Sequence, residues 1–122
     1  MLFHSTRGKD PNKDFASILM QGLADDGGLF MPDYWPQVDL DEIKSKTSFV
    51  DIAKCIVPLF TSSSFSYDET IAIVESTWHN FEHQDLIGIR DFNSVSILEL
   101  FHGPTAAFKD FGLQLAAAFF NK

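Results

Sequence analysis

Apolar side chains recur at helical spacing near the start of the chain. Phe15, Ile18, Leu19 and Leu23 stand at positions i, i+3, i+4 and i+8, so one face of a helix would carry all four. Two glycines at 27 and 28 interrupt the pattern, and glycine commonly follows the end of a helix. The pattern predicts a first helix that these glycines stop, followed by a short extended segment at 29–31.

Two more helices are predicted before the middle of the chain. A short one starts at Asp39. A longer one starts after Ser48, because a serine followed three positions later by an acidic residue, here Asp51, resembles a capping arrangement. Pro58 must kink or end this helix, since proline lacks an amide hydrogen. We expect the helix to finish near Phe60.

A polar loop of serines separates that helix from the next one. Ser66 and Glu69 have the spacing of a capping box, in which each residue bonds to the other's backbone. Apolar residues then recur at i, i+3, i+7 and i+10 between Ile71 and Phe81. These two signals predict a helix from about Tyr67 to Phe81.

The pattern changes after Gly88. Residues 95–100 form a short apolar and β-branched run between Asn93–Ser94 and Gly103–Pro104, which is typical of a buried strand. From Asp110 onward the chain is apolar almost all round a helix, so we expect a buried final helix. A domain boundary is expected near residues 85–93.

Composition and charge limit the possible partners. Hydrophobic residues make up 45% of the chain and include thirteen phenylalanines, so a core can form. The formal net charge is −8, and the nine basic residues are scattered. Because nucleic acids and anionic membranes are bound by clustered Lys and Arg, we expect neither as a partner. With the single cysteine Cys55 and no apolar run near the roughly 20 residues that span a bilayer, we expect a cytoplasmic protein.

Lys109 is the residue whose position indicates chemistry. It stands between the predicted strand and the final helix, so two rigid elements would hold it. The positive end of a helix disfavours an ammonium group and favours the neutral amine, which is a nucleophile. The ordinary alternative is a lysine that is merely exposed to solvent.

The segment around Lys109 closely resembles a known family. Residues 99–110, ELFHGPTAAFKD, are similar to the cofactor-lysine segment of threonine synthase, a pyridoxal 5'-phosphate (PLP) enzyme. Two other blocks occur in the family's order: Ser5–Gly8 resembles its opening, and Gly22–Pro32 resembles its next signature. From about 39 to 92 the chain matches only in helical character. At Ala106 the family more often has a bulkier apolar residue, a difference that concerns packing.

The resemblance implies a fold, a cofactor and a reaction. The fold is α/β: a mainly helical N-terminal domain over residues 1–90, then the first strand, cofactor-lysine loop and helix of a PLP-binding α/β domain over 91–122. Lys109 would be both the catalytic and the cofactor-binding residue, carrying PLP as a Schiff base and moving protons between substrate carbons. The reaction would convert O-phosphohomoserine and water to L-threonine and phosphate.

Other residues allow more than one interpretation. Ser5–Arg7 offers two hydroxyls and a guanidinium, groups that bind a phosphate monoester, or it is a solvated surface segment. Gly22–Gly28 is either a phosphate loop or a helix cap and turn, and its two adjacent carboxylates favour the turn. His102 could order the loop or approach the substrate, and Phe108 could pack on the cofactor ring or on the core. Asp110 is expected to cap the final helix.

We expect no metal site. His79 and His83 have the i, i+4 spacing of a two-histidine metal pair, but the sequence offers no third ligand or central glutamate to complete it.

Length argues that the chain is truncated. A chain of 122 residues is about one domain, whereas the family builds its site between two and holds the cofactor phosphate in a glycine-rich loop that does not follow Lys109 here. We expect weak PLP binding, no turnover by the isolated chain, and self-association through its apolar last helix. Three functions stay open: the front part of a threonine synthase, the front part of a threonine-synthase-like phospho-lyase, or a non-catalytic remnant that serves as an interaction module.

Overall fold

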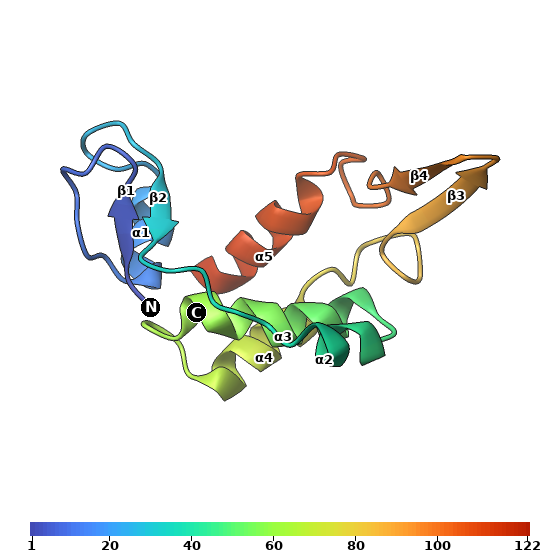
Figure 1. Cartoon of the computed structure of the whole chain (residues 1–122), viewed down its shortest axis with the longest axis horizontal. Helices are drawn as coiled ribbons and strands as arrows, with labels where there is room; N and C mark the ends of the chain where they lie inside the picture. Colours follow the sequence, from blue (N-terminus) through green and yellow to red (C-terminus); the bar gives the residue numbers. More distant parts are fainter.

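The computed structural model describes all 122 residues as five helices and four short strands (Figure 1). In chain order they are β1 (Phe3–Ser5), α1 (Phe15–Gln21), β2 (Phe30–Pro32), α2 (Leu40–Ser45), α3 (Phe49–Thr61), α4 (Tyr67–Ser76), β3 (Gly88–Phe92), β4 (Val95–Glu99) and α5 (Asp110–Phe120). Helices α3, α4 and α5 form the body; β1, β2 and α1 form a lobe at one end, and the hairpin β3–β4 projects from the other end. None of the helices has the length and apolar character required to cross a bilayer.

The helix starts agree with the capping signals in the sequence. The Asp39 side chain caps α2, and the Ser48 hydroxyl accepts the amide of Asp51 at 3.0 Å at the start of α3. Ser66 and Glu69 form both halves of the expected capping box at the start of α4. These predictions are confirmed. The sequence could reveal the caps because a cap depends on residues that lie close together in the chain.

Two helices end earlier than predicted. Helix α1 stops at Gln21 because Gly22 follows it with a positive φ of 74°, which leaves Leu23 outside the helix. Helix α4 stops at Ser76, five residues before Phe81. There the backbone of Thr77 is extended, its hydroxyl donates to the carbonyl of Ile73 at 2.8 Å, and Trp78 has a left-handed φ of 62°.

The strand predicted at 95–100 is present as β4, but the expectation that it is buried was wrong. Strand β4 pairs with β3 in an antiparallel hairpin whose turn is Asn93–Ser94. Ile97 and Leu98 are about half exposed. The sequence pattern assigned residues 88–92 to a boundary, so their pairing with β4 was missed.

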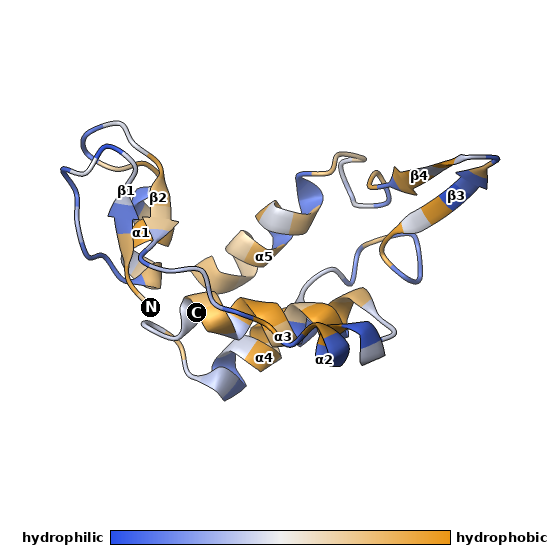
Figure 2. Ribbon diagram, viewed as in Figure 1, coloured by the Kyte–Doolittle hydropathy of each residue, from blue (hydrophilic) through white to orange (hydrophobic).

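The core lies where α3, α4 and α5 meet. Ala53, Val74, Trp78 and Leu86 are buried, and Phe111 of α5 packs against them. Apolar positions cover much of α3 and α5 in Figure 2. Helix α5 is nevertheless only partly covered, since Leu113 and Phe120 are more than half exposed, so the helix is not buried in this chain and leaves an apolar face open.

A second aromatic contact fixes the direction of α5. Phe119, near its C-terminal end, packs on Phe15 of α1 and on Phe65, with ring centroids 5.1 Å from each. The C-terminal end of α5 therefore lies against the N-terminal lobe. Its other end begins directly after Lys109 and faces the hairpin side of the molecule (Figure 1). The division into domains at residue 90 stays a prediction.

Candidate functional site

Lys109 occupies the residue that immediately precedes α5. Its backbone is already helical, with φ −64° and ψ −19°, and its carbonyl accepts the amide of Leu113 at 2.9 Å. The side chain is exposed, and its amine makes no hydrogen bond or ion pair in the structure. A free amine at the positive end of a helix is available as a nucleophile once it loses its proton.

The other lysines differ from Lys109 in position or in pairing. The amines of four of them are held by carboxylates: Lys13, Lys44, Lys46 and Lys54. Lys9 lies in the loop after β1, and Lys122 is the last residue of the chain. Only Lys109 combines an unpaired amine with a place directly before the first residue of a helix.

An open apolar depression of about 460 Å³ lies beside Lys109. Phe108, Phe111 and Leu113 line it, and Gly112 leaves space there because an added Cβ would meet no atom within 4 Å. Phe108 is 64% exposed, so it does not pack in the core of this chain. An exposed aromatic ring beside a free amine can pack against a flat heteroaromatic ring.

Asp110 does not cap α5, contrary to the expectation. The helix has no side-chain cap; instead the Asp110 carboxylate reaches back and accepts the hydroxyl of Thr105 at 2.6 Å and its amide at 2.9 Å. The Thr105 hydroxyl bond, followed by the backbone amides, holds the pKa of Asp110 below its usual range despite burial. Sequence spacing gave no signal for this pair, because no common capping rule joins residues five apart in this direction.

His102 is tied to the base of the hairpin. Its Nε2 lies 3.0 Å from Oε2 of Glu99, and the other oxygen of Glu99 pairs with Nε of Arg90 at 2.5 Å. The carbonyl of His102 also accepts the amide of Glu82 at 2.9 Å. These contacts support the loop-ordering interpretation of His102. The three side chains line a cavity of about 610 Å³ between the start of α3 and the hairpin base.

No metal centre is present among these groups. The rings of His83 and His102 lie 4.8 Å apart. However, no set of three or more His, Cys, Asp or Glu side chains in the chain gathers closely enough to hold a metal ion.

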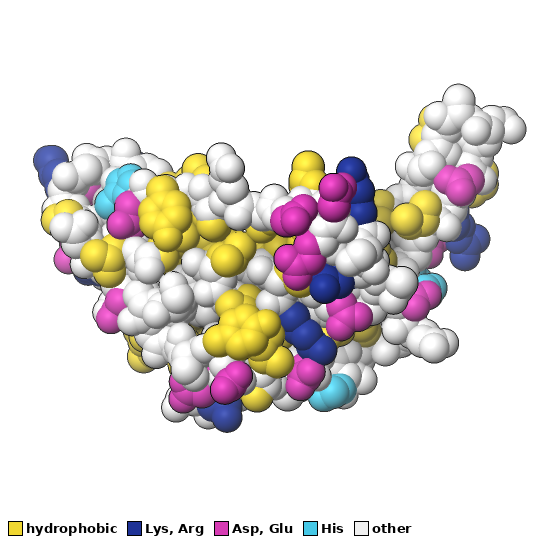
Figure 3. Space-filling view, turned by 60° about the horizontal axis from the view of Figure 1, so that its bottom comes forward, with side chains coloured by type: hydrophobic (Ala, Val, Ile, Leu, Met, Phe, Trp, Pro, Cys, Tyr) yellow, Lys and Arg dark blue, Asp and Glu magenta, His cyan; other side chains and the backbone are white.

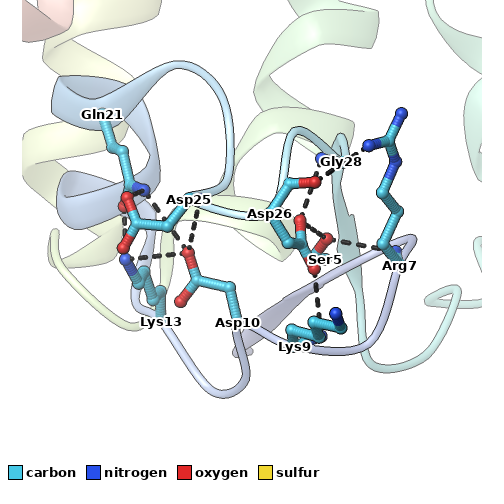
Figure 4. Close-up of polar contacts among 9 residues, drawn as sticks. All are labelled: Ser5, Arg7, Lys9, Asp10, Lys13, Gln21, Asp25, Asp26 and Gly28. Carbon is cyan, nitrogen blue, oxygen red and sulfur yellow. Dashed lines mark hydrogen bonds and ion pairs between the residues drawn. The ribbon is translucent and has the colours of Figure 1, made fainter.

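Asp26 organises the N-terminal lobe (Figure 4). Its carboxylate accepts the Ser5 hydroxyl at 2.6 Å and the amides of Gly28 and Lys9 at 2.9 and 3.0 Å. The bond from Ser5 is the largest cause that lowers the pKa of Asp26. The amides of Asp25, Gly27 and Gly28 are all bonded within the protein, so the turn interpretation of 22–28 fits the structure and the phosphate-loop interpretation does not.

Ser5–Arg7 does not lie beside Lys109. The Arg7 guanidinium donates to the carbonyl of Asp26 at 2.9 Å, and the Thr6 hydroxyl accepts the amide of Leu29 at 3.0 Å. The lobe that holds them contacts the Phe119 end of α5. At 1.5 Å per residue, this end is about 15 Å from Lys109 along the helix axis. The structure therefore separates the two sequence blocks.

Comparisons with known proteins give a consistent result. Residues 2–78 match the family model described as threonine synthase N terminus. Over 118 residues the chain is 40% identical to threonine synthase of Pseudomonas aeruginosa, covering 94% of this chain and 25% of the relative. Over 123 residues it is 37% identical to threonine synthase-like 2 of Pongo abelii, covering 98% of this chain and 25% of that relative.

Solved structures agree with the sequence comparisons. The crystal structure of PLP-bound threonine synthase from Brucella melitensis superposes with a TM-score of 0.90 at 34% identity, over 99% of this chain and 27% of that one. The α/β fold expected from the sequence is confirmed as that of the N-terminal region of these proteins. The chain spans about a quarter of the length of the relatives it matches.

Proposed function

The chain belongs to the threonine synthase family, and from this premise we propose that it forms the front part of an enzyme that makes L-threonine and phosphate from O-phosphohomoserine and water. We assign Lys109 as the residue that binds PLP. The observation that carries this assignment is the free, exposed amine at the strand-to-helix junction, within the segment that resembles the family's cofactor-lysine segment.

The residues present fit PLP in two respects. An unpaired amine can form an imine with the cofactor aldehyde, whereas an amine held in an ion pair must first be released. The exposed ring of Phe108 and the apolar depression beside it can pack against the pyridine ring. When bound, PLP supplies an electron sink for the substrate α-carbon.

Lys109 has two tasks in this proposal. It anchors the cofactor, and after the substrate has displaced it, its amine accepts and returns protons at the substrate carbons. The start of α5 serves both tasks, because the helix holds the backbone of Lys109 in place. We propose that the remaining binding groups belong to the three quarters of the relatives that this chain does not cover. The isolated chain would then bind PLP weakly and turn over no substrate.

A second candidate is supported by the Pongo abelii relative, whose name marks it as threonine synthase-like. The chain would then be the front part of a phospho-lyase that acts on a related amino-alcohol phosphate. Both candidates use Lys109 in the same way, so the product distinguishes them. We propose a cytoplasmic location for either one.

The test uses a chimera of this chain and the part of the Pseudomonas aeruginosa relative that it does not cover. Supplied with PLP and O-phosphohomoserine, the chimera should release threonine and phosphate in equal amounts, and the Lys109→Ala variant should release neither. Phosphate release with a product other than threonine would favour the phospho-lyase. Equal turnover by chimera and variant would overturn the assignment of Lys109.

A further inference from the structure

Thr105 and Asp110 close a short hydrogen-bonded ring around the residues that lead into α5. Asp110 is only 1% exposed, and its carboxylate accepts both the amide and the hydroxyl of Thr105, at 2.9 and 2.6 Å. The amide of Asp110 donates to the carbonyl of Ala107 at 3.0 Å. Because a charged acceptor strengthens these bonds, the ring resists opening.

Gly103 makes this ring possible. Its backbone packs so closely on Asp110 that an added Cβ would lie within 3 Å of three atoms of the aspartate side chain. Its carbonyl accepts the amide of Ala106 at 3.0 Å, where Ala106 has a left-handed φ of 55°. A non-glycine residue keeps such a conformation only where its surroundings hold it.

Lys109 lies within this ring, between Thr105 and Asp110. Its backbone is fixed by the buried Asp110 that follows it and by the bond from the amide of Leu113 to its carbonyl. Its side chain touches no hydrogen-bonding partner of its own. The backbone on which it stands therefore sets the region that the amine can reach.

We propose that Asp110 and Thr105 are positioning residues that hold Lys109 in the orientation from which its amine reaches the cofactor. This inference rests on the proposed role of Lys109. Neither residue touches the amine, so both act through the backbone of the loop. A small displacement of a reacting group lowers its rate sharply, which is why a rigid loop matters here.

The test measures the rate at which PLP, added to the cofactor-free chimera, becomes fixed to Lys109 after borohydride reduction. Four variants are compared with the parent: Asp110→Asn, Thr105→Val, Thr105→Ser and Thr70→Val. Thr105 is exposed, so Thr105→Val removes the hydroxyl bond without opening a cavity. Thr70→Val is the matched control, because it removes a buried hydroxyl that bonds to Thr61 at 2.9 Å in a helix pair away from the loop.

We expect Thr105→Val and Asp110→Asn to lower the rate of fixation by about tenfold or more, while Thr105→Ser, which keeps the hydroxyl, and Thr70→Val leave it unchanged. If Thr105→Val and Asp110→Asn both fixed PLP at the rate of the parent, the positioning role would be overturned and the proposed function would remain intact. A fall in all variants in proportion to their unfolding temperatures would also overturn it. Fixation of PLP on a lysine other than Lys109 in the parent would overturn the proposed function itself.

Discussion

The indole nitrogen of Trp78 donates a hydrogen bond to the backbone carbonyl of Phe111 at 3.0 Å. Trp78 follows the end of α4, and Phe111 stands in the first turn of α5, two residues after Lys109. Phe49 of α3 packs on both, with ring centroids 5.0 and 5.2 Å away. The start of α5 is thus attached to the core by one hydrogen bond and one aromatic cluster.

Trp78→Phe should lower the free energy of unfolding by about 1 to 3 kcal/mol, because it removes this bond and leaves a small cavity. Urea denaturation of the chain measures the change. Trp35→Phe is the matched control, since Trp35 is 67% exposed and should change stability little. Equal effects of the two substitutions would contradict the structural role of Trp78.

Two glycines should respond to alanine in opposite ways. A Cβ at Gly28 would clash with the Ser5 hydroxyl, so Gly28→Ala should destabilise the chain by about 1 to 3 kcal/mol. A Cβ at Gly112 meets nothing within 4 Å inside α5, so Gly112→Ala should stabilise it by up to about 1 kcal/mol. Thermal unfolding of both variants checks the pair. A stable Gly28→Ala protein would mean that Ser5 and Asp26 do not pack as described.

Stability should fall in acid. Six carboxyl groups have pKa values below their ordinary range: Asp10, Asp14, Asp26, Asp51, Glu69 and Asp110. A carboxyl group whose pKa is lower in the folded state makes its full contribution to stability above its pKa in the unfolded chain, about 4. This contribution is lost as the pH falls through its pKa in the folded state. Urea midpoints should therefore be constant near neutral pH and decrease below about pH 4.

Asp26→Asn tests the origin of this acid effect. The Ser5 hydroxyl is the main cause of the lowered Asp26 pKa, so the variant should be less stable at neutral pH and lose less stability in acid than the parent. If the urea midpoint of the variant fell with pH as steeply as that of the parent, Asp26 would not be among the groups responsible.

Local signals predict the helix starts well, whereas the pairing of β3 with β4 does not follow from them. The capping box of Ser66 and Glu69 depends on residues three apart, so the sequence alone reveals it. Helix α4 ends before Thr77, whose backbone is extended, and the next residue, Trp78, bonds to α5, a contact that periodicity does not contain. Lys109 stands out from its segment of the sequence, whereas the bonds between Asp110 and Thr105 become visible only in the fold, because no capping rule joins residues at this spacing.

The isolated chain should self-associate. Both strands of the β3–β4 hairpin have an unpaired edge, and Ile89, Phe92 and Val95 on it are more than half exposed, as is Leu113 on α5. Hydrophobic side chains also lie between the charged ones on the face in Figure 3. Contiguous exposed apolar surface and free strand edges favour association.

Sedimentation velocity over a range of concentrations tests this prediction. The parent chain should form larger species as its concentration rises, and Ile89→Lys together with Leu113→Lys should shift it toward monomer. A monomeric parent at high concentration would contradict the prediction.

The most direct test of the central claim is to locate the PLP-bearing lysine by chemistry. After borohydride reduction of the PLP-loaded chimera, peptide mapping should find the phosphopyridoxyl mass on the peptide that contains Phe108, Lys109 and Asp110. Lys109→Arg should abolish this label, since a guanidinium stays protonated and cannot attack the cofactor aldehyde, while Lys9→Arg, which changes another exposed and unpaired lysine, should not. Label on a different peptide with Lys109 unmodified, or full activity in Lys109→Arg, would contradict the account.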